Sequence, residues 1–294
     1  NFENNEIFNF LLFNSYKELK QMLIEYDEIY IRSINDFFRL ILFCRLKNIQ
    51  IIYDFRGLVA FESYFRKKNI LRFLILFAGE FLAYRFSENV QCVSNNLKIK
   101  LFKYYGRKKV DVIPCLTFDC IKRKDDINNR IKFVYLGGLS KWQRIDLIIS
   151  TSIAIQKIIK AEFTFITYEK KKLKEKLKKT PLLKYKIVSV DNRNVINYLK
   201  NQDFGFLFRH DIIVNEVASP IKFLEYISSG VIPILTPFVG DYSKEVVQKK
   251  LGIIFRNDNE KLIKDIKKVS DQIILYRKRL YDYSLSYTWK NFNK

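Results

Sequence analysis

The sequence predicts an α/β protein with two parallel sheets, one in each half of the chain. Short apolar runs of strand length alternate with helical patterns along most of the chain, which is typical of parallel sheets flanked by helices. The alternation is interrupted by the polar segment 122–130 (KRKDDINNR), a candidate linker, and then starts again. At 294 residues the chain has room for two such sheets. We expect a first domain over 1–122, a second over 123–275 and a C-terminal helix over 276–294.

The first half contains four apolar runs with helical patterns around them. Ser15 is a good N-cap for the first helix, and the periodic apolar residues after it supply one buried face. The expected strands are 28–32, 49–53, 90–93 and 110–113, and the expected helices are 15–26, 35–47, 60–87 and 95–104.

The second half repeats the same alternation after the candidate linker. Two glycines follow its first strand directly, and a lysine-rich helix follows its second. The expected strands are 132–136, 162–166, 187–190, 204–208, 231–235 and 252–255, and the expected helices are 142–159, 169–178, 195–200, 220–229 and 259–269.

The most apolar helical pattern is 70–86 (ILRFLILFAGEFLAYRF). It approaches the roughly 20 residues that a helix needs to cross a bilayer. However, Arg72, Glu80 and Arg85 interrupt it, and a charge in mid-membrane is costly. A buried or interfacial helix is therefore favoured over a spanning one. If its apolar face is exposed, this helix can dock on a membrane beside neighbouring Lys and Arg side chains.

The chain is strongly basic, with 53 Lys and Arg against 31 Asp and Glu and a formal charge of +22. Such an excess points to nucleic acid, an anionic membrane or anionic substrates. The lysines are scattered except in 170–179, and no RNA-binding signature accompanies them, so nucleic acid is the least expected partner.

Cysteine and histidine give no basis for a metal site. The four cysteines form no CxxC pair, and His210 is the only histidine, so it is more simply a structural or exposed residue. Sparse cysteines suit a reducing cytoplasm. No signal-peptide pattern opens the sequence, and because it lacks an initial Met we expect it to begin inside a longer chain.

Segment 204–237 carries the clearest pattern for binding. Pro220 suits the first position of a helix with Ser219 as its N-cap, and Gly230 suits the end of that helix. Lys222 in the first turn opposes the helix dipole, whereas an anion at the helix start would account for it. Glu225 lies on the same face. Two interpretations stay open: a phosphate clamp with a carboxylate for a sugar hydroxyl, or an ordinary buried helix with a surface Lys–Glu pair.

A second phosphate-binding candidate is segment 133–146 (FVYLGGLSKWQRID). Gly137 and Gly138 directly after a strand allow a ligand to approach the backbone, and a helix is expected to start near Ser140. Lys141 and Arg144 can supply positive charge there. A glycine pair after a strand is common, so this candidate depends on the helix downstream.

Three further residues follow expected strands and face the same sheet edges. Arg209 follows strand 204–208, and either contacts phosphate or sugar or is a surface arginine. Asp54 and Arg56 follow strand 49–53, and either face a substrate or form a structural pair.

Residues 209–241 resemble the donor-site segment of retaining GT-B glycosyltransferases, family 4 and its relatives. In those enzymes a Ser-Pro-x-Lys-x-x-Glu-Tyr helix and a small-small-Gly-x-x-Pro turn hold the nucleotide sugar. The matching residues here are Ser219, Pro220, Lys222, Glu225, Tyr226, Ser228, Ser229, Gly230 and Pro233.

The resemblance implies a GT-B fold, with two Rossmann-like domains facing a cleft, a shortened N-terminal domain and a C-terminal helix that returns to it. It implies that Glu225 binds the ribose hydroxyls. The partner glutamate of the family is expected eight residues earlier, where Val217 stands, so Glu216 beside it is the candidate. In the first domain an Asp-x-Arg-Gly loop implies that Asp54 and Arg56 face the acceptor or the transferred sugar.

These residues give the following expectations. The catalytic candidates are Asp54, Arg56 and Glu216, and the donor-binding candidates are Gly137, Gly138, Lys141, Arg144, Arg209, Ser219, Lys222 and Glu225. No Asp-x-Asp cluster is placed for a metal, so we expect metal independence and no cofactor.

The function implied is transfer of a sugar from a nucleotide sugar, with retention, to a saccharide or lipid-linked acceptor in bacterial surface polysaccharide synthesis. The expected place is the cytoplasm, at the inner face of an anionic membrane. The alternative is a non-catalytic GT-B scaffold that binds membrane or nucleic acid through its basic surface.

Overall fold

The computed structural model describes residues 15–117, 119–124, 130–178, 180, 183–191 and 194–292. Most of the candidate linker, 125–129, lies outside these ranges. Within them the chain forms two compact units, which are named here by their residues. The first unit comprises 15–92 and 101–111, and the second comprises 93–100 and the described residues from 112 onward.

The first unit contains a four-stranded sheet of order β1-β2-β3-β4. Strand β2 pairs in parallel with both β1 and β3. The strands are β1 (Glu28–Ile31), β2 (Gln50–Phe55), β3 (Asn89–Cys92) and β4 (Asp111–Val112). The helices are α1 (Tyr16–Leu23), α2 (Ile34–Leu46), α3 (Val59–Lys67), α4 (Ile70–Phe86) and α5 (Asn95–Tyr105), the last of which begins in the second unit.

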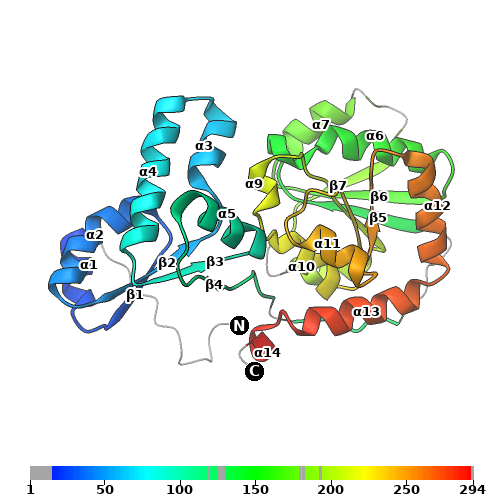
Figure 1. Ribbon diagram of the computed structural model, residues 1–294. Coiled ribbons are helices and arrows are strands. Elements are labelled where there is room, and N and C mark those ends of the chain that lie inside the picture. Colours follow the sequence, from blue (N-terminus) through cyan, green and yellow to red (C-terminus); the bar gives the residue numbers. More distant parts are fainter. Residues whose placement is uncertain are drawn as a thin grey trace. The chain divides into compact units, whose positions relative to one another are not determined.

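Helices α3 and α4 form a hairpin that rises from the sheet of the first unit (Figure 1). The sequence predicted a helical pattern over 60–87, which the structure divides into two helices, and the helix predicted over 70–86 is α4. Lys68 adopts a left-handed conformation with φ of 53° and ends α3. Asn69 then caps α4, because its Oδ1 accepts a hydrogen bond from Arg72 N at 2.8 Å.

The second unit contains a six-stranded sheet of order β10-β9-β8-β5-β6-β7, in which every neighbouring pair is parallel. The strands are β5 (Ile131–Leu136), β6 (Ala161–Ile166), β7 (Tyr185–Val188), β8 (Phe204–Leu207), β9 (Ile232–Leu235) and β10 (Ile253–Ile254). The predicted mixed α/β fold with two parallel sheets is therefore confirmed.

Helices flank this sheet, with α6 and α7 on one side and α10 and α13 on the other (Figure 1). They are α6 (Ile145–Gln156), α7 (Lys170–Lys178), α8 (Val195–Leu199), α9 (Ile213–Glu216), α10 (Ile221–Ser228), α11 (Tyr242–Gln248), α12 (Asn259–Ser270), α13 (Ile273–Leu285) and α14 (Trp289–Phe292). The sequence missed α9 and α11.

The helix expected to start near Ser140 starts later. One turn of 3₁₀ helix (Lys141–Gln143) comes first, and α6 follows it as a separate helix.

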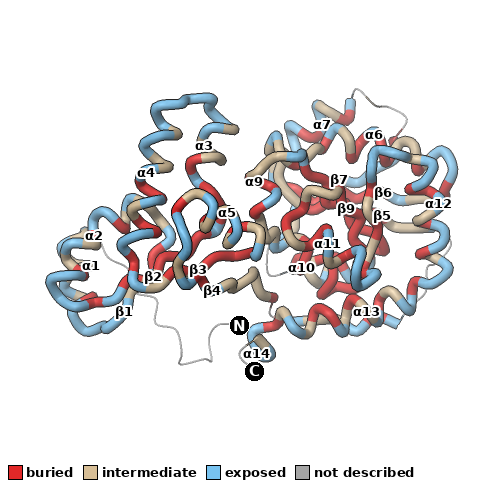
Figure 2. Tube along the Cα trace, viewed as in Figure 1, coloured by how far each residue is buried: buried red, intermediate tan, exposed pale blue. Residues whose placement is uncertain are grey.

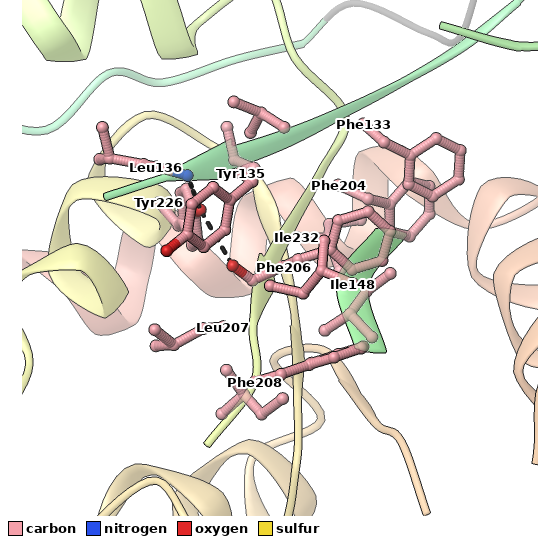
Figure 3. Close-up of a cluster of buried hydrophobic side chains, with 14 of the residues drawn as sticks. Phe133, Tyr135, Leu136, Ile148, Phe204, Phe206, Leu207, Phe208, Tyr226 and Ile232 are labelled. Carbon is pink, nitrogen blue, oxygen red and sulfur yellow. Dashed lines mark hydrogen bonds between the residues drawn. The ribbon is translucent and has the colours of Figure 1, made fainter. Parts of the chain in front are cut away.

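The core of the second unit is centred on Phe133 in β5. Its ring stacks on Phe163 at 5.1 Å, on Phe204 at 5.4 Å and on Phe206 at 5.6 Å, measured between ring centroids (Figure 3). These rings are almost completely buried, as the interior strands in Figure 2 show. Burial on both faces accounts for the apolar strand runs in the sequence. This packing holds the carboxyl ends of β5 and β8 in fixed positions.

The C-terminal helix α13 is held to the second unit by a buried cluster of charges. Arg277 on α13 donates to Asp203 Oδ1 at 2.7 Å, and Arg123 lies 3.6 Å from the same oxygen. All three side chains are almost fully buried, so each charge depends on the others.

None of the helices within the described ranges is long and apolar enough to cross a membrane.

Candidate functional site

The site begins where β5 ends, at Gly137 and Gly138. Gly137 has φ of +145°, and its N–H donates to Ile166 O at 2.9 Å. A Cβ atom on Gly137 would lie only 1.8 Å from Lys222 Nζ, and one on Gly138 would lie 3.0 Å from Glu169 Oε2. Glycine at 137 therefore lets the ammonium group of α10 lie directly against the end of β5.

Lys222 is a partly buried cation whose hydrogen-bond partner is neutral. Its Nζ donates to Gln143 Oε1 at 2.9 Å and lies 6.0 Å from the centre of the Tyr135 ring. Burial, with the charge of Arg209 acting in the same direction, lowers the pKa of Lys222 to about 7. Glu225 on the same helix raises this pKa, but by less than burial lowers it.

Arg209 is a buried cation that acts on Lys222 at this site. It follows β8 and is only 7% exposed. Its backbone N–H donates to Thr236 Oγ1 at 2.7 Å, and its carbonyl accepts from the same hydroxyl at 3.0 Å. Its side-chain Nη1 is buried and has no hydrogen-bond partner among the described residues. Burial lowers the pKa of Arg209.

Lys222 and Arg209 are adjacent cations, and Glu225 offsets the charge of Lys222 only in part, so the pair is an unfavourable arrangement in the ligand-free protein. An anion bound beside Lys222 and Arg209 would favour the charged form of both and would give Arg209 Nη1 an acceptor. The chemistry of this corner is therefore that of a phosphate or diphosphate site.

Glu225 lies one turn after Lys222 on α10, beside a pocket of about 230 Å³. Burial raises the pKa of Glu225, and the charge of Lys222 opposes this rise. Apolar side chains form much of the pocket, and Glu225 and Lys222 form its polar end. Its lining is Leu136, Gly137, Gly138, Ile166, Thr167, Tyr168, Val190, Val195, Ile221, Lys222 and Glu225. A flat, partly apolar group with vicinal hydroxyls, such as a nucleoside, fits this lining.

Gln143 is a site residue that the sequence did not propose. Its Oε1 accepts from Lys222 Nζ and, at 2.6 Å, from the hydroxyl of Tyr135. It is buried, whereas Lys141 beside it is exposed. The signal was its place six residues after Gly137, where many relatives in the resembled family carry a lysine.

The remaining donor-site candidates lie outside this pocket. Ser219 does not cap α10, which begins one residue later than expected; its Oγ lies 2.9 Å from Tyr242 Oη instead. Arg144 has a left-handed backbone and is the N-cap of α6. The pKa of His210 is lowered mainly by its partial burial and also by the charge of Arg144. Lys141 is at the start of the 3₁₀ turn.

The first-unit candidates form a compact ionic cluster. Asp54 lies inside β2 rather than after it, because β2 extends to Phe55, and Asp54 is only 2% exposed. Its Oδ2 accepts from Arg56 Nε at 2.5 Å and from Arg32 Nε at 3.1 Å. The interpretation as a structural Asp–Arg pair fits this geometry.

Glu216, the last catalytic candidate, ends the short helix α9. Its side chain is 49% exposed, and its carboxylate lies 3.0 Å from Lys100 Nζ. The neighbouring Val217 is fully buried. The structure does not bring Glu216 into the pocket beside Glu225.

Among the described residues, no cluster of three or more His, Cys, Asp or Glu side chains is arranged to hold a metal ion.

Comparison with known proteins finds similarity at the level of structure. No protein-family model matches this chain, and no curated protein sequence matches it. Sucrose-phosphate synthase from Thermosynechococcus elongatus is similar to it with a TM-score of 0.71 and 13% identity, over 93% of this chain and 73% of the synthase.

Two further solved structures show the same likeness. HepE from Anabaena, in complex with UDP-glucose, matches with a TM-score of 0.70 and 13% identity over 94% of this chain and 79% of HepE. WaaG, a glycosyltransferase involved in lipopolysaccharide biosynthesis, matches with a TM-score of 0.61 and 13% identity over 92% of this chain and 77% of WaaG. The chain therefore has the fold of the GT-B glycosyltransferases.

Proposed function

We propose that this protein is a glycosyltransferase that takes a sugar from a nucleotide-sugar donor bound at the Lys222 pocket. The observation that carries the proposal is the pair of adjacent cations, partly buried Lys222 and buried Arg209, at the glycine-rich end of β5. The solved structures with this fold include one in complex with UDP-glucose, so a uridine nucleotide is the first donor to test.

We propose a role for each of three groups at this site. Lys222 and Arg209 bind the diphosphate, and Glu225 accepts hydrogen bonds from the ribose hydroxyls. As the bond between the sugar and the diphosphate breaks, negative charge grows on the leaving phosphate. Fixed cations in a site with little water stabilise that charge most effectively.

We infer that transfer needs no metal ion, because Lys222 and Arg209 supply positive charge at the leaving group. We also propose retention of configuration, with the acceptor oxygen entering on the face that the diphosphate leaves and its proton passing to the departing phosphate oxygen. The likeness of the Ser219–Pro233 segment to family 4 supports this. No protein nucleophile is assigned.

We propose a saccharide or lipid-linked acceptor and a role in bacterial surface polysaccharide synthesis. The structural match to WaaG supports this setting. The matched structures are named as sugar-transfer enzymes or as complexes with a nucleotide sugar, which favours an enzyme over the alternative of a non-catalytic basic scaffold.

We also propose that the first unit docks on an anionic membrane. Three side chains of α2, Phe38, Leu42 and Leu46, are exposed at helical spacing. Helix α4, which packs on α2, exposes Ile70, Leu71, Leu74 and Ile75. Basic side chains flank these apolar turns, so the surface matches an anionic lipid interface in both polarity and charge.

Flotation with phosphatidylglycerol vesicles should recover the protein, and Leu71→Ser with Ile75→Ser should reduce recovery strongly. Equal recovery of both proteins would contradict docking.

The test of the enzyme is release of UDP from a panel of UDP-sugars, followed by product analysis with crude surface glycans as acceptors. One donor should be turned over, and Glu225→Ala and Lys222→Ala should each reduce turnover by about two orders of magnitude or more. Glu260→Ala, an exposed change on α12, is the matched control. Turnover that survives both pocket variants would refute the assigned site.

A further inference from the structure

The first unit has its own pocket, of about 320 Å³, that the donor site does not use. It lies where β1 ends and α2 begins, and the α3–α4 hairpin forms its other wall. The lining residues are Arg32, Ser33, Ile34, Asn35, Val59, Glu62, Ser63, Arg66, Lys67, Arg72 and Leu76.

Positive charge dominates this pocket. Its lining contains four cationic side chains, Arg32, Arg66, Lys67 and Arg72, and one carboxylate, Glu62. Glu62 Oε2 lies 3.7 Å from Arg66 Nη2, so this one carboxylate offsets only part of the positive charge. Arg32 shares the single carboxylate of Asp54 with Arg56. The pocket is therefore suited to an anion.

Arg66 and Arg72 line the pocket with exposed guanidinium groups. Arg72 Nε donates to Ser63 Oγ at 2.9 Å, a hydrogen bond that joins α4 to α3. A guanidinium carries five N–H donors in a fork that matches two oxygens of a phosphate. Arg66 and Arg72 come from different helices of the hairpin, so they can contact one phosphate from two directions.

Apolar surface adjoins this cationic pocket on the same turns of α4. Ile70, Leu71, Leu74 and Ile75 are each more than half exposed, although Arg72 between them lines the pocket. The first half of α4 is accordingly drawn as exposed in Figure 2. An anionic group in the pocket can therefore be joined to an apolar chain that lies along α4.

We propose that this pocket binds the phosphate or diphosphate of a lipid-linked acceptor. This inference rests on the proposed glycosyltransferase function and specifies the chemical class of its acceptor. Arg66 and Arg72 bind the phosphate oxygens, with Lys67 and Arg32 adding positive charge, while the lipid chain stays at the membrane surface beside α4.

The test compares vesicles of phosphatidylcholine that carry farnesyl phosphate with vesicles matched in surface charge by phosphatidylglycerol. The protein should bind the farnesyl phosphate vesicles about tenfold more tightly or better, because a monoester offers more oxygens and charge to the arginines. Arg66→Gln with Arg72→Gln should remove this preference. Lys264→Gln with Lys268→Gln, on exposed α12, removes the same charge and should keep it.

Each outcome decides the proposal. No preference for the monoester in the natural protein, or a preference that survives Arg66→Gln with Arg72→Gln, would overturn it. If inorganic phosphate alone binds as tightly as the farnesyl phosphate vesicles, the site takes a soluble phosphate and the lipid assignment is wrong. UDP binding, measured in parallel by thermal shift, reports on the second unit. Its absence would refute the donor site without affecting the vesicle result.

Discussion

At the scale of single residues, the hydroxyl of Tyr226 connects the two strands that hold the site. It accepts a hydrogen bond from Leu136 N at 2.9 Å and donates one to Phe206 O at 3.2 Å (Figure 3). The ring is fully buried and lies against Gly205, where a Cβ atom would approach it to 2.7 Å. Because the ring is so closely enclosed, a water molecule has no room to take the place of the hydroxyl.

We therefore predict that Tyr226→Phe destabilises the second unit. The change leaves the buried Leu136 N–H without an acceptor, which costs about 1–3 kcal/mol. Chemical denaturation followed by tryptophan fluorescence measures this directly. Tyr168→Phe, which removes the exposed hydrogen bond to Val190 O, is the control and should cost much less. Equal losses in the two variants would contradict the role of Tyr226.

Lys222 predicts an uptake of protons when a nucleotide binds. With its pKa near 7 in the ligand-free protein, Lys222 is largely neutral at about pH 8, and a bound diphosphate favours the ammonium form. Calorimetry of UDP binding in buffers of different ionisation enthalpy should show this uptake.

Lys222→Arg, whose side chain stays charged, should bind without the uptake. The same lysine makes the free protein more stable as pH rises from about 7 to 10.5, because the unfolded chain then holds the proton that the folded chain has lost. Binding with no proton uptake in the natural protein would show that Lys222 is already charged or is not at the phosphate.

The sequence identified some of these residues and not others, for physical reasons. Lys222 and Glu225 stood in a helical pattern whose charge opposed the dipole, and that signal does not depend on tertiary contacts. The only signal for Gln143 was its position after Gly137, because its role arises from contacts with Tyr135 and Lys222, and Lys222 lies far away in the chain. Asp54 was placed after its strand because aspartate is rare within buried strands. The two arginines that neutralise it explain the exception.

At the scale of elements, the turn after β5 is as important as the helix that it faces. Gly137 has a φ of +145°. A Cβ atom at this position would lie 1.8 Å from Lys222 Nζ, and no other described glycine lies against this lysine. The turn and α10 therefore act as one phosphate-binding element.

Gly137→Ala should weaken nucleotide binding by about tenfold or more while the protein stays folded, because the new methyl group displaces the ammonium of Lys222. Isothermal calorimetry with UDP measures the loss. Gly106→Ala is a matched control, since Gly106 also has a positive φ, 91°, but has open space around its Cβ position. If Gly106→Ala weakens UDP binding equally, general strain rather than Lys222 accounts for the effect.

Most element types could be predicted from sequence, and the exceptions have identifiable causes. Helix α11 was missed because tertiary contacts stabilise it, including Tyr242 stacked on Phe223 at 4.1 Å. The break between α3 and α4 depends on the left-handed conformation of Lys68. Glycine is the usual signal for this conformation, and a lysine stands there instead. Asn69 as the cap of α4 was a usable signal for this break.

At the scale of the whole molecule, each of the two units has its own sheet and its own interior. Both tryptophans, Trp142 and Trp289, belong to the second unit. Tryptophan fluorescence therefore follows the second unit, while far-ultraviolet circular dichroism follows both.

The first unit should become less stable as pH rises from about 4.5 to 7. Glu80 is completely buried and accepts from Val59 N at 2.7 Å and Tyr105 Oη at 3.2 Å, and burial raises its pKa to about 7. Because the folded state holds this proton to higher pH than the unfolded state, ionisation costs stability in that window.

Thermal unfolding measured by circular dichroism should show a transition, absent from tryptophan fluorescence, whose midpoint falls over this range. Glu80→Gln should remove the fall, since the amide does not ionise. A midpoint that is insensitive to pH in the natural protein, or equally sensitive in Glu80→Gln, would contradict the assignment.

The central claim is that the second unit binds a nucleotide through Lys222, Arg209 and Glu225. The most direct test is thermal stability at fixed salt against a panel of nucleoside diphosphates and nucleotide sugars. We predict that one base, uracil first, stands out. A ligand at about 100 times its Kd should stabilise the protein by roughly 2.7 kcal/mol, and Lys222→Ala and Glu225→Ala should lose this shift while Glu260→Ala keeps it. If no nucleotide stabilises the folded protein, or if the shift persists in both pocket variants, the donor-site assignment is wrong.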